Sequence, residues 1–226
     1  MPGFAVIVLA AGGSSRLGQP KQLVVYVGEP LVRRATRTAV ESGAEQVIVV
    51  LGAHAEAVRK SLDGLVVKTV VNANWQLGLG SSIRCGAEAL SPGITAVVLS
   101  LCDMPLVTRD LLRELAEAVA DGDPPIAAAE YNCHLGVPCA FHSSRFPALR
   151  ELSGDKGARD LVRTAPRVAR FTFQAWKYSC DTRSSQSLYA ARVRVAQRLN
   201  ITVKEFLCSS PPPDPVSTFR NTYLFW

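Results

Sequence analysis

The strongest constraint on this chain is the alternation of short, continuously apolar segments with longer amphipathic ones. The first apolar segment, Phe4–Ala10, reads FAVIVLA and has no polar residue. A strand that is apolar at every position is typical of a parallel sheet covered by helices on both faces, because neither side of it meets water. Similar runs lie at Gln46–Leu51 and Ala96–Leu101. The sequence therefore predicts an α/β fold built on a mostly parallel sheet.

Strand and helix patterns follow one another repeatedly in the first half of the chain. Gly43 is a stop signal for the first expected helix, and Thr108 is a suitable N-cap for the fourth. This order predicts a doubly wound, Rossmann-like α/β sheet. We expect strands over residues 4–10, 46–51, 65–71 and 96–101, and helices over residues 30–42, 53–62, 81–90 and 108–120.

The pattern is less regular in the second half of the chain. We expect strands over residues 126–129, 137–141 and 168–173, and helices over residues 143–152 and 158–164. After residue 174 the signals weaken to a basic amphipathic segment over residues 188–199 and a proline-rich linker over residues 209–215. We therefore expect one α/β domain over residues 1–174, followed by a divergent tail over residues 175–226.

Charge and apolar content exclude several classes of partner. The net charge is +6, but residues 1–174 hold 18 basic and 16 acidic side chains, whereas residues 175–226 hold 7 and 3. A nearly neutral domain argues against a nucleic-acid-binding face, and no apolar run approaches the length of about 20 residues that crosses a bilayer. The six cysteines follow no disulfide framework. We therefore expect a cytoplasmic protein with reduced thiols, and neither nucleic acid nor membrane as a partner.

The loop after the first strand carries the clearest sign of a ligand. Residues 9–23 read LAAGGSSRLGQPKQL, and ligands of α/β sheets bind where strands end. Small residues allow backbone N–H groups to surround an anion, and Arg16 and Lys21 add two positive charges. The spacing differs from G-x-G-x-x-G, and Gln-Pro-Lys stands where a Walker A loop has Gly-Lys-Ser/Thr. The residues favour a triphosphate-binding loop of another kind; the alternative is a Gly/Ser connector with incidental charges.

This loop resembles a family signature, L-A-A/G-G-x-x-x-R-L/M-G-x-x-K, of nucleotidyltransferases that act on sugar phosphates, isoprenoid precursors and molybdopterin. Three further segments resemble the same family: NANWQLGLGSSI over residues 72–83, CDMP over residues 102–105 and GDKG over residues 154–157. The similarity covers residues 4–173. The chain thus resembles the MobA-like nucleotidyltransferases, and most of all their molybdenum cofactor cytidylyltransferase branch.

The resemblance implies a reaction and a set of ligands. CMP would be transferred from CTP to a phosphate acceptor, molybdopterin, with release of pyrophosphate and with Mg²⁺ as the metal. Ala11 would favour CTP, because Leu-Ala-Ala-Gly tends to accompany CTP in this group and Leu-Ala-Gly-Gly tends to accompany GTP. The implied partners are a nucleoside triphosphate, a molybdopterin-type small molecule, and a molybdoenzyme or its chaperone.

The same resemblance assigns roles to individual residues. Arg16 and Lys21 would hold the phosphates, and Asp103, which follows a strand, would bind the metal. A turn-forming role is the alternative for Asp103 and for Asn72. The residues that would bind the nucleotide are Leu9, Ala10, Ala11, Gly12, Gly13, Lys21 and Asn72.

The resemblance breaks down at its C-terminal end. The family closes with an acidic D-x-D-T-P-x-D segment, whereas residues 179–185 read SCDTRSS and keep only Asp181 and Thr182. An inactive scaffold that binds nucleotide or cofactor is therefore one alternative to an active transferase. The fold and the transfer activity would also be compatible with GTP as the donor, or with a sugar or alcohol phosphate as the acceptor.

Two other groups of residues have simpler interpretations. Arg33, Arg34 and Arg37 lie along the first expected helix, and we interpret them as a solvated basic face. The second group consists of two cysteines and two histidines: Cys133, His134, Cys139 and His142. Such residues can bind zinc, but their spacing matches neither C-x-x-C nor H-x-x-x-H units, so structural or substrate-site roles are favoured.

Overall fold

A computed structural model of the chain describes residues 3–14, 19–131, 134–155 and 157–172. Arg16 and Cys133 lie outside these residues, as do Asp181 and both segments expected in the tail. The domain boundary expected at residue 174 therefore stays a prediction.

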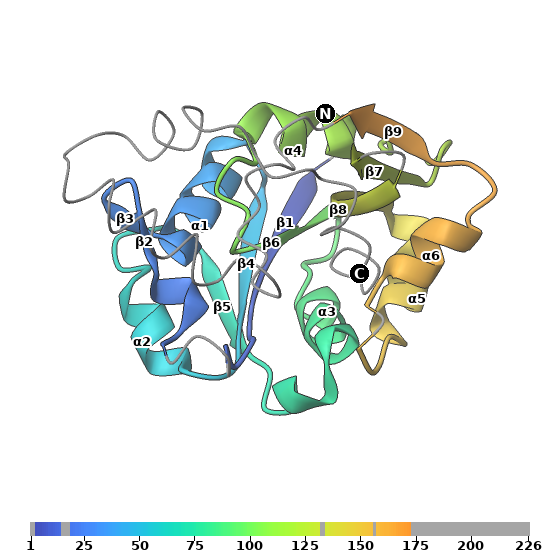
Figure 1. Ribbon diagram of the computed structural model, residues 1–226. Coiled ribbons are helices and arrows are strands. Elements are labelled where there is room, and N and C mark those ends of the chain that lie inside the picture. Colours follow the sequence, from blue (N-terminus) through green and yellow to red (C-terminus); the bar gives the residue numbers. More distant parts are fainter. Residues whose placement is uncertain (1–2, 15–18, 132–133, 156, 173–226) are drawn as a thin grey trace, which may run out of the picture.

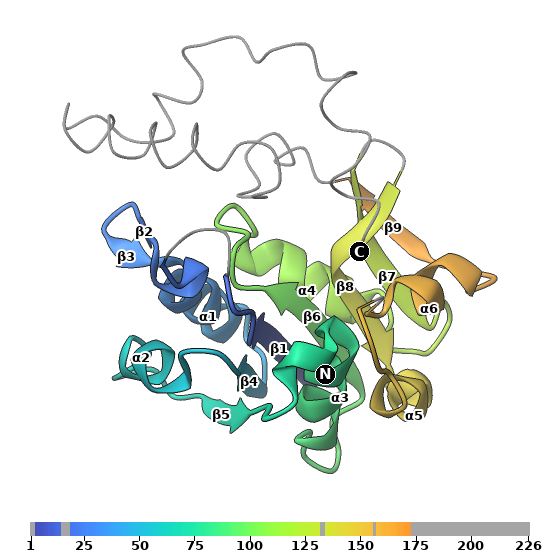
Figure 2. The ribbon, with the colours of Figure 1, turned by 60° about the horizontal axis from the view of Figure 1, so that its bottom comes forward.

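The described residues form a mostly parallel sheet, in the order β5–β4–β1–β6–β8–β7–β9. The first four of these strands are parallel, β8 is antiparallel to both its neighbours, and β9 runs parallel to β7. Figure 2 shows β5 and β9 at the two edges. The bounds are β1 (Phe4–Ala10), β4 (Gln46–Leu51), β5 (Lys68–Val71), β6 (Ala96–Leu101), β7 (Ile126–Tyr131), β8 (His134–His142) and β9 (Ala169–Thr172).

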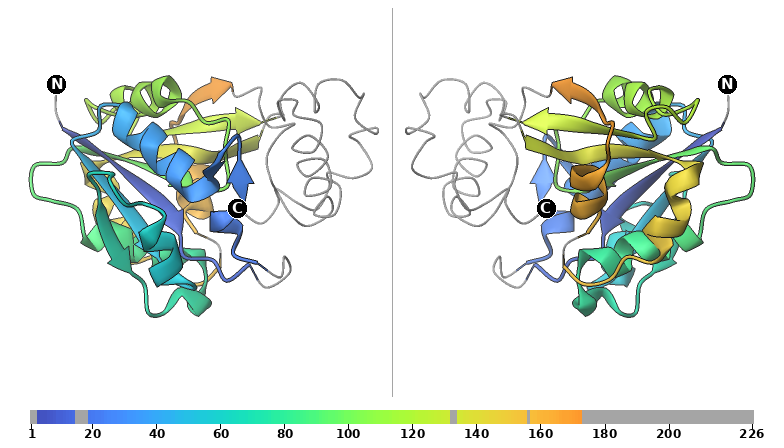
Figure 3. Two further views of the ribbon diagram at one scale, coloured as in Figure 1. Left: turned by 90° about the vertical axis from the view of Figure 1, so that its left-hand side faces the viewer. Right: turned by 90° about the vertical axis from the view of Figure 1, so that its right-hand side faces the viewer.

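Helices cover both faces of this sheet, as its apolar strands require. α1 (Leu31–Glu41) contacts α4 (Arg109–Glu117), whereas α3 (Leu79–Glu88) contacts α5 (Phe146–Arg150) across the sheet from them (Figures 1 and 3). Two short helices, α2 (Ala55–Lys60) and α6 (Arg159–Thr164), complete the layers. The doubly wound α/β fold predicted from the sequence is confirmed.

The central strand β1 forms the middle of the core. Ile7 pairs in register with Ile48 of β4 and Leu99 of β6, and all three side chains are fully buried. Burying a side chain of this size contributes about 1.5–3 kcal/mol. Since both faces of β1 are covered, its apolar run needs no alternation, which explains why its bounds are those expected from the sequence.

Helix ends follow local backbone chemistry. Gly43, at a φ of 84°, lies just past the end of α1, and Thr108 Oγ1 accepts a 3.2 Å hydrogen bond from Leu111 N at the start of α4. Both signals are confirmed. α2 begins later than expected, because His54 has a left-handed φ of 60°, which a helical residue cannot adopt.

A small hairpin between the first strand and the first helix was not expected. β2 (Val25–Tyr26) and β3 (Glu29–Pro30) pair across a two-residue turn in which Val27 and Gly28 both have positive φ. Strands of two residues give no periodic signal, and valine is an unusual residue at such a turn. Over the described residues, none of the helices is both long enough and apolar enough to cross a membrane.

Candidate active site

The topology indicates at which end of the sheet a ligand is expected: the end where the parallel strands β4, β1 and β6 finish, called here the carboxyl edge. From β1 the chain proceeds outward through β4 to β5 and then crosses to β6, on the other side of β1. Loops that leave β1 and β6 therefore diverge at a topological switch point, where α/β sheets bind ligands. Backbone hydrogen bonds tie the end of β1 to the segments that follow its two neighbours: Cys102 N, after β6, donates to Leu9 O at 3.2 Å, and Ala53 N, after β4, donates to Ala11 O at 3.1 Å.

Lys21 and Asp103 meet at this edge. Lys21 opens the 3₁₀ helix η1 (Lys21–Leu23), Asp103 lies in the turn after β6, and their side chains form an ion pair. The side chains are 19% and 18% exposed, so both reach the surface. The two described residues predicted to handle phosphate and metal are thus adjacent. Arg16, predicted beside them, lies outside the described residues.

Gln22 organises the loop and was not among the predicted site residues. Its side chain is 2% exposed, and its Nε2 donates to Ala10 O at 3.0 Å and to Gly12 O at 2.6 Å. Ser14, at a φ of 51°, accepts a 2.9 Å hydrogen bond from Lys21 N through its hydroxyl. Sequence alone does not show that this glutamine is buried. The one sign in the sequence that it belongs to the site is its position next to Lys21.

Gly12 and Gly13, the two glycines of this loop that the structure describes, differ in what surrounds them. A Cβ at Gly13 would lie 2.8 Å from the ring of Trp75, so Gly13 is needed for this aromatic side chain to pack on the loop. A Cβ at Gly12 would meet no atom within 4 Å, and Gly12 is not among the glycines with positive φ. The described residues therefore do not require glycine at position 12, whereas a ligand approaching the backbone would.

The residues just before these glycines are buried. Leu9, Ala10 and Ala11 are 4%, 1% and 5% exposed. Their side chains belong to the core, so nucleotide contacts at this end of β1 would come mainly from the backbone that follows. Their assignment to the nucleotide site stays a prediction.

Asn72 holds the loop that precedes α3. It is 6% exposed, and its Nδ2 donates to Ser81 Oγ at 2.8 Å and to Ser82 Oγ at 3.1 Å. Its Oδ1 accepts a 2.9 Å hydrogen bond from Asn74 N. These bonds are those of a turn-forming residue, which was the alternative interpretation. A nucleotide contact for Asn72 stays a prediction.

The GDKG segment packs against the same loop. Gly80 N donates a 2.8 Å hydrogen bond to Gly154 O, and a Cβ at Gly80 would lie 2.8 Å from the backbone of Ser153. A Cβ at Gly78 would similarly overlap the Asp155 carboxylate. Glycines at the start of α3 thus allow residues 153–155 to lie directly on the helix end.

The zinc interpretation receives no support from the described part of the chain. Cys139 is fully buried in β8, and burial raises the pKa of its thiol well above the usual range, which keeps it protonated. His134 and His142 lie at opposite ends of the same strand. No cluster of three or more His, Cys, Asp or Glu side chains that could hold a metal occurs among the described residues.

One carboxylate at the switch point nevertheless suits a magnesium ion that arrives with a nucleotide. Mg²⁺ keeps several waters and is bound through one or two carboxylates together with substrate phosphates. Asp103 can supply such a carboxylate, and Lys21 beside it can neutralise phosphate oxygens. The donor set therefore fits a metal shared with a triphosphate rather than a metal caged by protein ligands.

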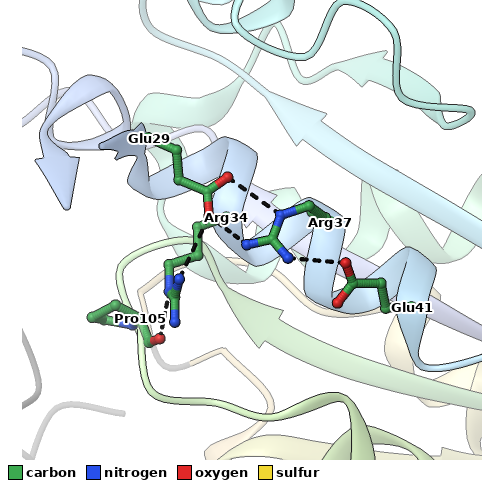
Figure 4. Close-up of polar contacts among 5 residues, drawn as sticks. All are labelled: Glu29, Arg34, Arg37, Glu41 and Pro105. Carbon is green, nitrogen blue, oxygen red and sulfur yellow. Dashed lines mark hydrogen bonds and ion pairs between the residues drawn. The ribbon is translucent and has the colours of Figure 1, made fainter. Parts of the chain in front are cut away.

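The basic face expected on the first helix is only partly solvated: Arg33, Arg34 and Arg37 are half-buried, and each also binds groups of the protein. Arg33 donates to the carbonyl oxygens of Ser61 and Asp63 at 2.9 and 2.8 Å. Arg34 and Arg37 also bind protein groups (Figure 4). Helical spacing alone does not reveal these contacts, because it does not show which loops fold back over the helix.

Comparison with known proteins gives consistent matches. The MobA-like NTP transferase domain matches residues 6–170, which include every loop described at this edge. Nicotine blue oxidoreductase of Paenarthrobacter nicotinovorans is 32% identical over 175 residues, 74% of this chain and 84% of that protein. The crystal structure of an rv0371c homologue from Mycobacterium sp. strain JC1 matches with a TM-score of 0.71 at 31% identity, covering 87% of this chain and 98% of that one. Rv0371c of Mycobacterium tuberculosis, in complex with manganese, matches with a TM-score of 0.63 at 30% identity, covering 76% and 88%.

Proposed function

The chain belongs to the MobA-like NTP transferase domain family, and from this premise we propose that it transfers CMP from CTP to molybdopterin, with release of pyrophosphate. The observation that carries the proposal is the pairing of Lys21 with Asp103 at the switch point of the sheet. A cation for the phosphates and a carboxylate for a divalent metal are the two groups that nucleotidyl transfer needs most.

In the proposed reaction, a phosphate oxygen of the acceptor attacks the α-phosphorus of CTP. A new oxygen–phosphorus bond forms there, and the bond to the bridging oxygen breaks, so that pyrophosphate leaves. Lys21 would turn from Asp103 toward the phosphates and neutralise their charge, while backbone N–H groups of the glycine loop orient them. Asp103 would hold Mg²⁺, which supplies Lewis-acid neutralisation of the phosphates when bound. A manganese complex of the relative Rv0371c supports a divalent metal.

Ligand-induced stabilisation tests this proposal. With CTP and Mg²⁺ at about 100 times the Kd, the folded state should gain about 2.7 kcal/mol, which raises the melting temperature by about 5–10 °C. CTP should give a larger rise than GTP, because Ala11 belongs to the Leu-Ala-Ala-Gly form of the loop. A melting temperature that no nucleoside triphosphate changes would contradict the proposal, and a larger rise with GTP would reassign the donor.

One relative favours a second candidate function, an oxidoreductase. Nicotine blue oxidoreductase shares 32% identity with this chain, and its name denotes redox chemistry. Two features of this chain support the transferase instead. The loop after β1 lacks the G-x-G-x-x-G spacing of a dinucleotide site, and its Lys21 pairs with the carboxylate of Asp103. The melting assay therefore includes the common nicotinamide dinucleotides, NADH and NADPH, and stabilisation by either of them but not by CTP would favour the redox function.

The acceptor and the place of the reaction complete the proposal. We expect a cytoplasmic reaction, with a molybdoenzyme or its chaperone receiving the product. A sugar or alcohol phosphate as the acceptor is separated from molybdopterin by a pyrophosphate-release screen with CTP. A scaffold that lost turnover would bind CTP yet release no pyrophosphate with any acceptor.

Gly12→Ala should impair binding without impairing folding. The added methyl group has open space in the free protein, so the melting temperature should not fall. If the triphosphate lies against the backbone of Gly12, CTP binding measured by calorimetry should weaken about tenfold, equivalent to about 1.4 kcal/mol. Gly13→Ala is the matched control: it should lower the melting temperature, because its methyl group meets the Trp75 ring. Wild-type affinity in Gly12→Ala would remove Gly12 from the site.

A further inference from the structure

Arg34 lies between the two segments that carry Lys21 and Asp103. It belongs to the first turns of α1, and its Nε donates a 2.8 Å hydrogen bond to the carbonyl oxygen of Pro105 (Figure 4). Pro105 is buried and comes two residues after Asp103, in the turn that follows β6. Because a hydrogen bond from a charged donor is about twice as strong as a neutral one, this contact fixes the backbone of the turn.

The hairpin that follows Lys21 holds the same guanidinium from another direction. The Arg34 NH1 lies 3.5 Å from Glu29 Oε1, and the guanidinium carbon lies 5.3 Å from the centre of the Tyr26 ring. Tyr26 is 5% exposed, so the ring is a fixed platform for the cation. Leu31 N, at the start of α1, also donates a 2.9 Å hydrogen bond to Val24 O, which ties the helix to the end of η1.

Glu29 is itself held in place and kept ionised. Arg37 contacts both Glu29 carboxylate oxygens, and its NH1 also donates to Glu41 at 2.9 Å (Figure 4). The hydrogen bonds from Arg37 lower the pKa of Glu29. Arg37 thus binds carboxylates of the hairpin and of its own helix, whereas Arg34 is the member of this group that reaches Pro105.

We propose that Arg34 is a positioning residue for Asp103, acting through the Pro105 carbonyl to set where this carboxylate lies relative to Lys21. A carboxylate that is correctly placed should bind a divalent cation together with a triphosphate; a displaced one should not. The inference rests on the proposed function, because it takes Asp103 as the metal ligand. Arg34 acts on the turn and not on the reacting atoms.

The test compares CTP binding by the full chain in EDTA and in saturating Mg²⁺, measured by calorimetry. The Kd in EDTA divided by the Kd in Mg²⁺ reports how much the metal strengthens binding. Arg34→Lys keeps the positive charge but cannot reach the Pro105 carbonyl, Glu29 and the Tyr26 ring together, since an ammonium lacks the planar fork. It should lower this ratio about tenfold, the usual scale for residues that orient a metal ligand, through weaker binding in Mg²⁺ and with no weakening in EDTA.

Arg37→Lys is the matched control, because Arg37 lies on the same helix and shares Glu29. It should keep the wild-type ratio. An unchanged ratio in Arg34→Lys, or an equal fall in Arg37→Lys, would overturn the positioning role. Should Arg34→Lys fail to fold, Glu29→Gln decides: it loosens Arg34 without changing the donor to Pro105, so a smaller fall supports the role and an unchanged ratio overturns it.

The wild-type protein separates failure of this inference from failure of the proposed function. Equal CTP affinity with and without Mg²⁺ would overturn both the role of Asp103 as a metal ligand and the role of Arg34 in positioning it. Nucleotide binding itself would still stand. No CTP binding in either buffer would overturn the proposed function, and the inference with it.

Discussion

Asp103→Asn should reduce Mg²⁺-dependent pyrophosphate release by about 10²-fold or more, the scale of losing one preorganised charged group at a reaction centre. Asparagine keeps the size and local hydrogen bonds of aspartate but not the negative charge that a hard cation requires. The Asp103 side chain is partly exposed at the end of β6, so the change should leave the core intact. If Asp103 were only a turn residue, asparagine would serve nearly as well.

The same variant should bind CTP at least as tightly as the wild type when EDTA removes the metal. In the wild type, the Asp103 carboxylate competes with the triphosphate for the Lys21 ammonium, and asparagine removes this competitor. Calorimetry in EDTA and in Mg²⁺ measures both effects. Asp110→Asn, which removes an exposed carboxylate from α4, is the charge-matched control. Wild-type turnover in Asp103→Asn would contradict its role as a metal ligand.

Lys21→Ala should weaken CTP binding in both buffers and slow transfer by about 10²-fold or more. Lys21 is the positive side chain that the structure places beside Asp103 at the switch point. Its loss removes an attraction for the phosphates whether or not a metal is present. This separates it from Asp103→Asn, whose defect should appear only with Mg²⁺. The fold should persist, because the Lys21 side chain is partly exposed and begins a short 3₁₀ helix rather than a core element.

Lys60→Ala provides the control for Lys21→Ala. Lys60 is an exposed residue at the end of α2, so this change removes the same charge from the surface away from the switch point. It should leave CTP affinity and pyrophosphate release unchanged. Equal turnover by Lys21→Ala and the wild type, in an assay with CTP, Mg²⁺ and acceptor, would remove Lys21 from the mechanism.

The central strands were predictable because burial on both faces requires an unbroken apolar run. β1, β4 and β6 have the bounds that their sequences indicate. Since parallel strands have their carboxyl ends at the same end of the sheet, the order of elements also places the loop that carries Lys21 and the turn that carries Asp103 at that end. The structure adds that their side chains form an ion pair.

The roles of Gln22 and Arg34 were not predictable in the same way. A buried glutamine is recognised by the carbonyl groups around it, here those of Ala10 and Gly12, and these follow from the path of the loop. Arg34 was expected in solvent because its helical position alone contains no sign of the Pro105 carbonyl. Contacts between side chains and distant backbone depend on packing that a single sequence does not reveal.

The most direct measurement of the proposed reaction follows the α-phosphorus of CTP. The full chain is incubated with Mg²⁺, molybdopterin and CTP labelled at this atom, and the products are separated. We predict that labelled CMP is joined to molybdopterin while an equal amount of unlabelled pyrophosphate appears, and that Lys21→Ala and Asp103→Asn lose both products. Label that remains in CTP, or that is released as free CMP with no labelled acceptor, would contradict the proposed transfer.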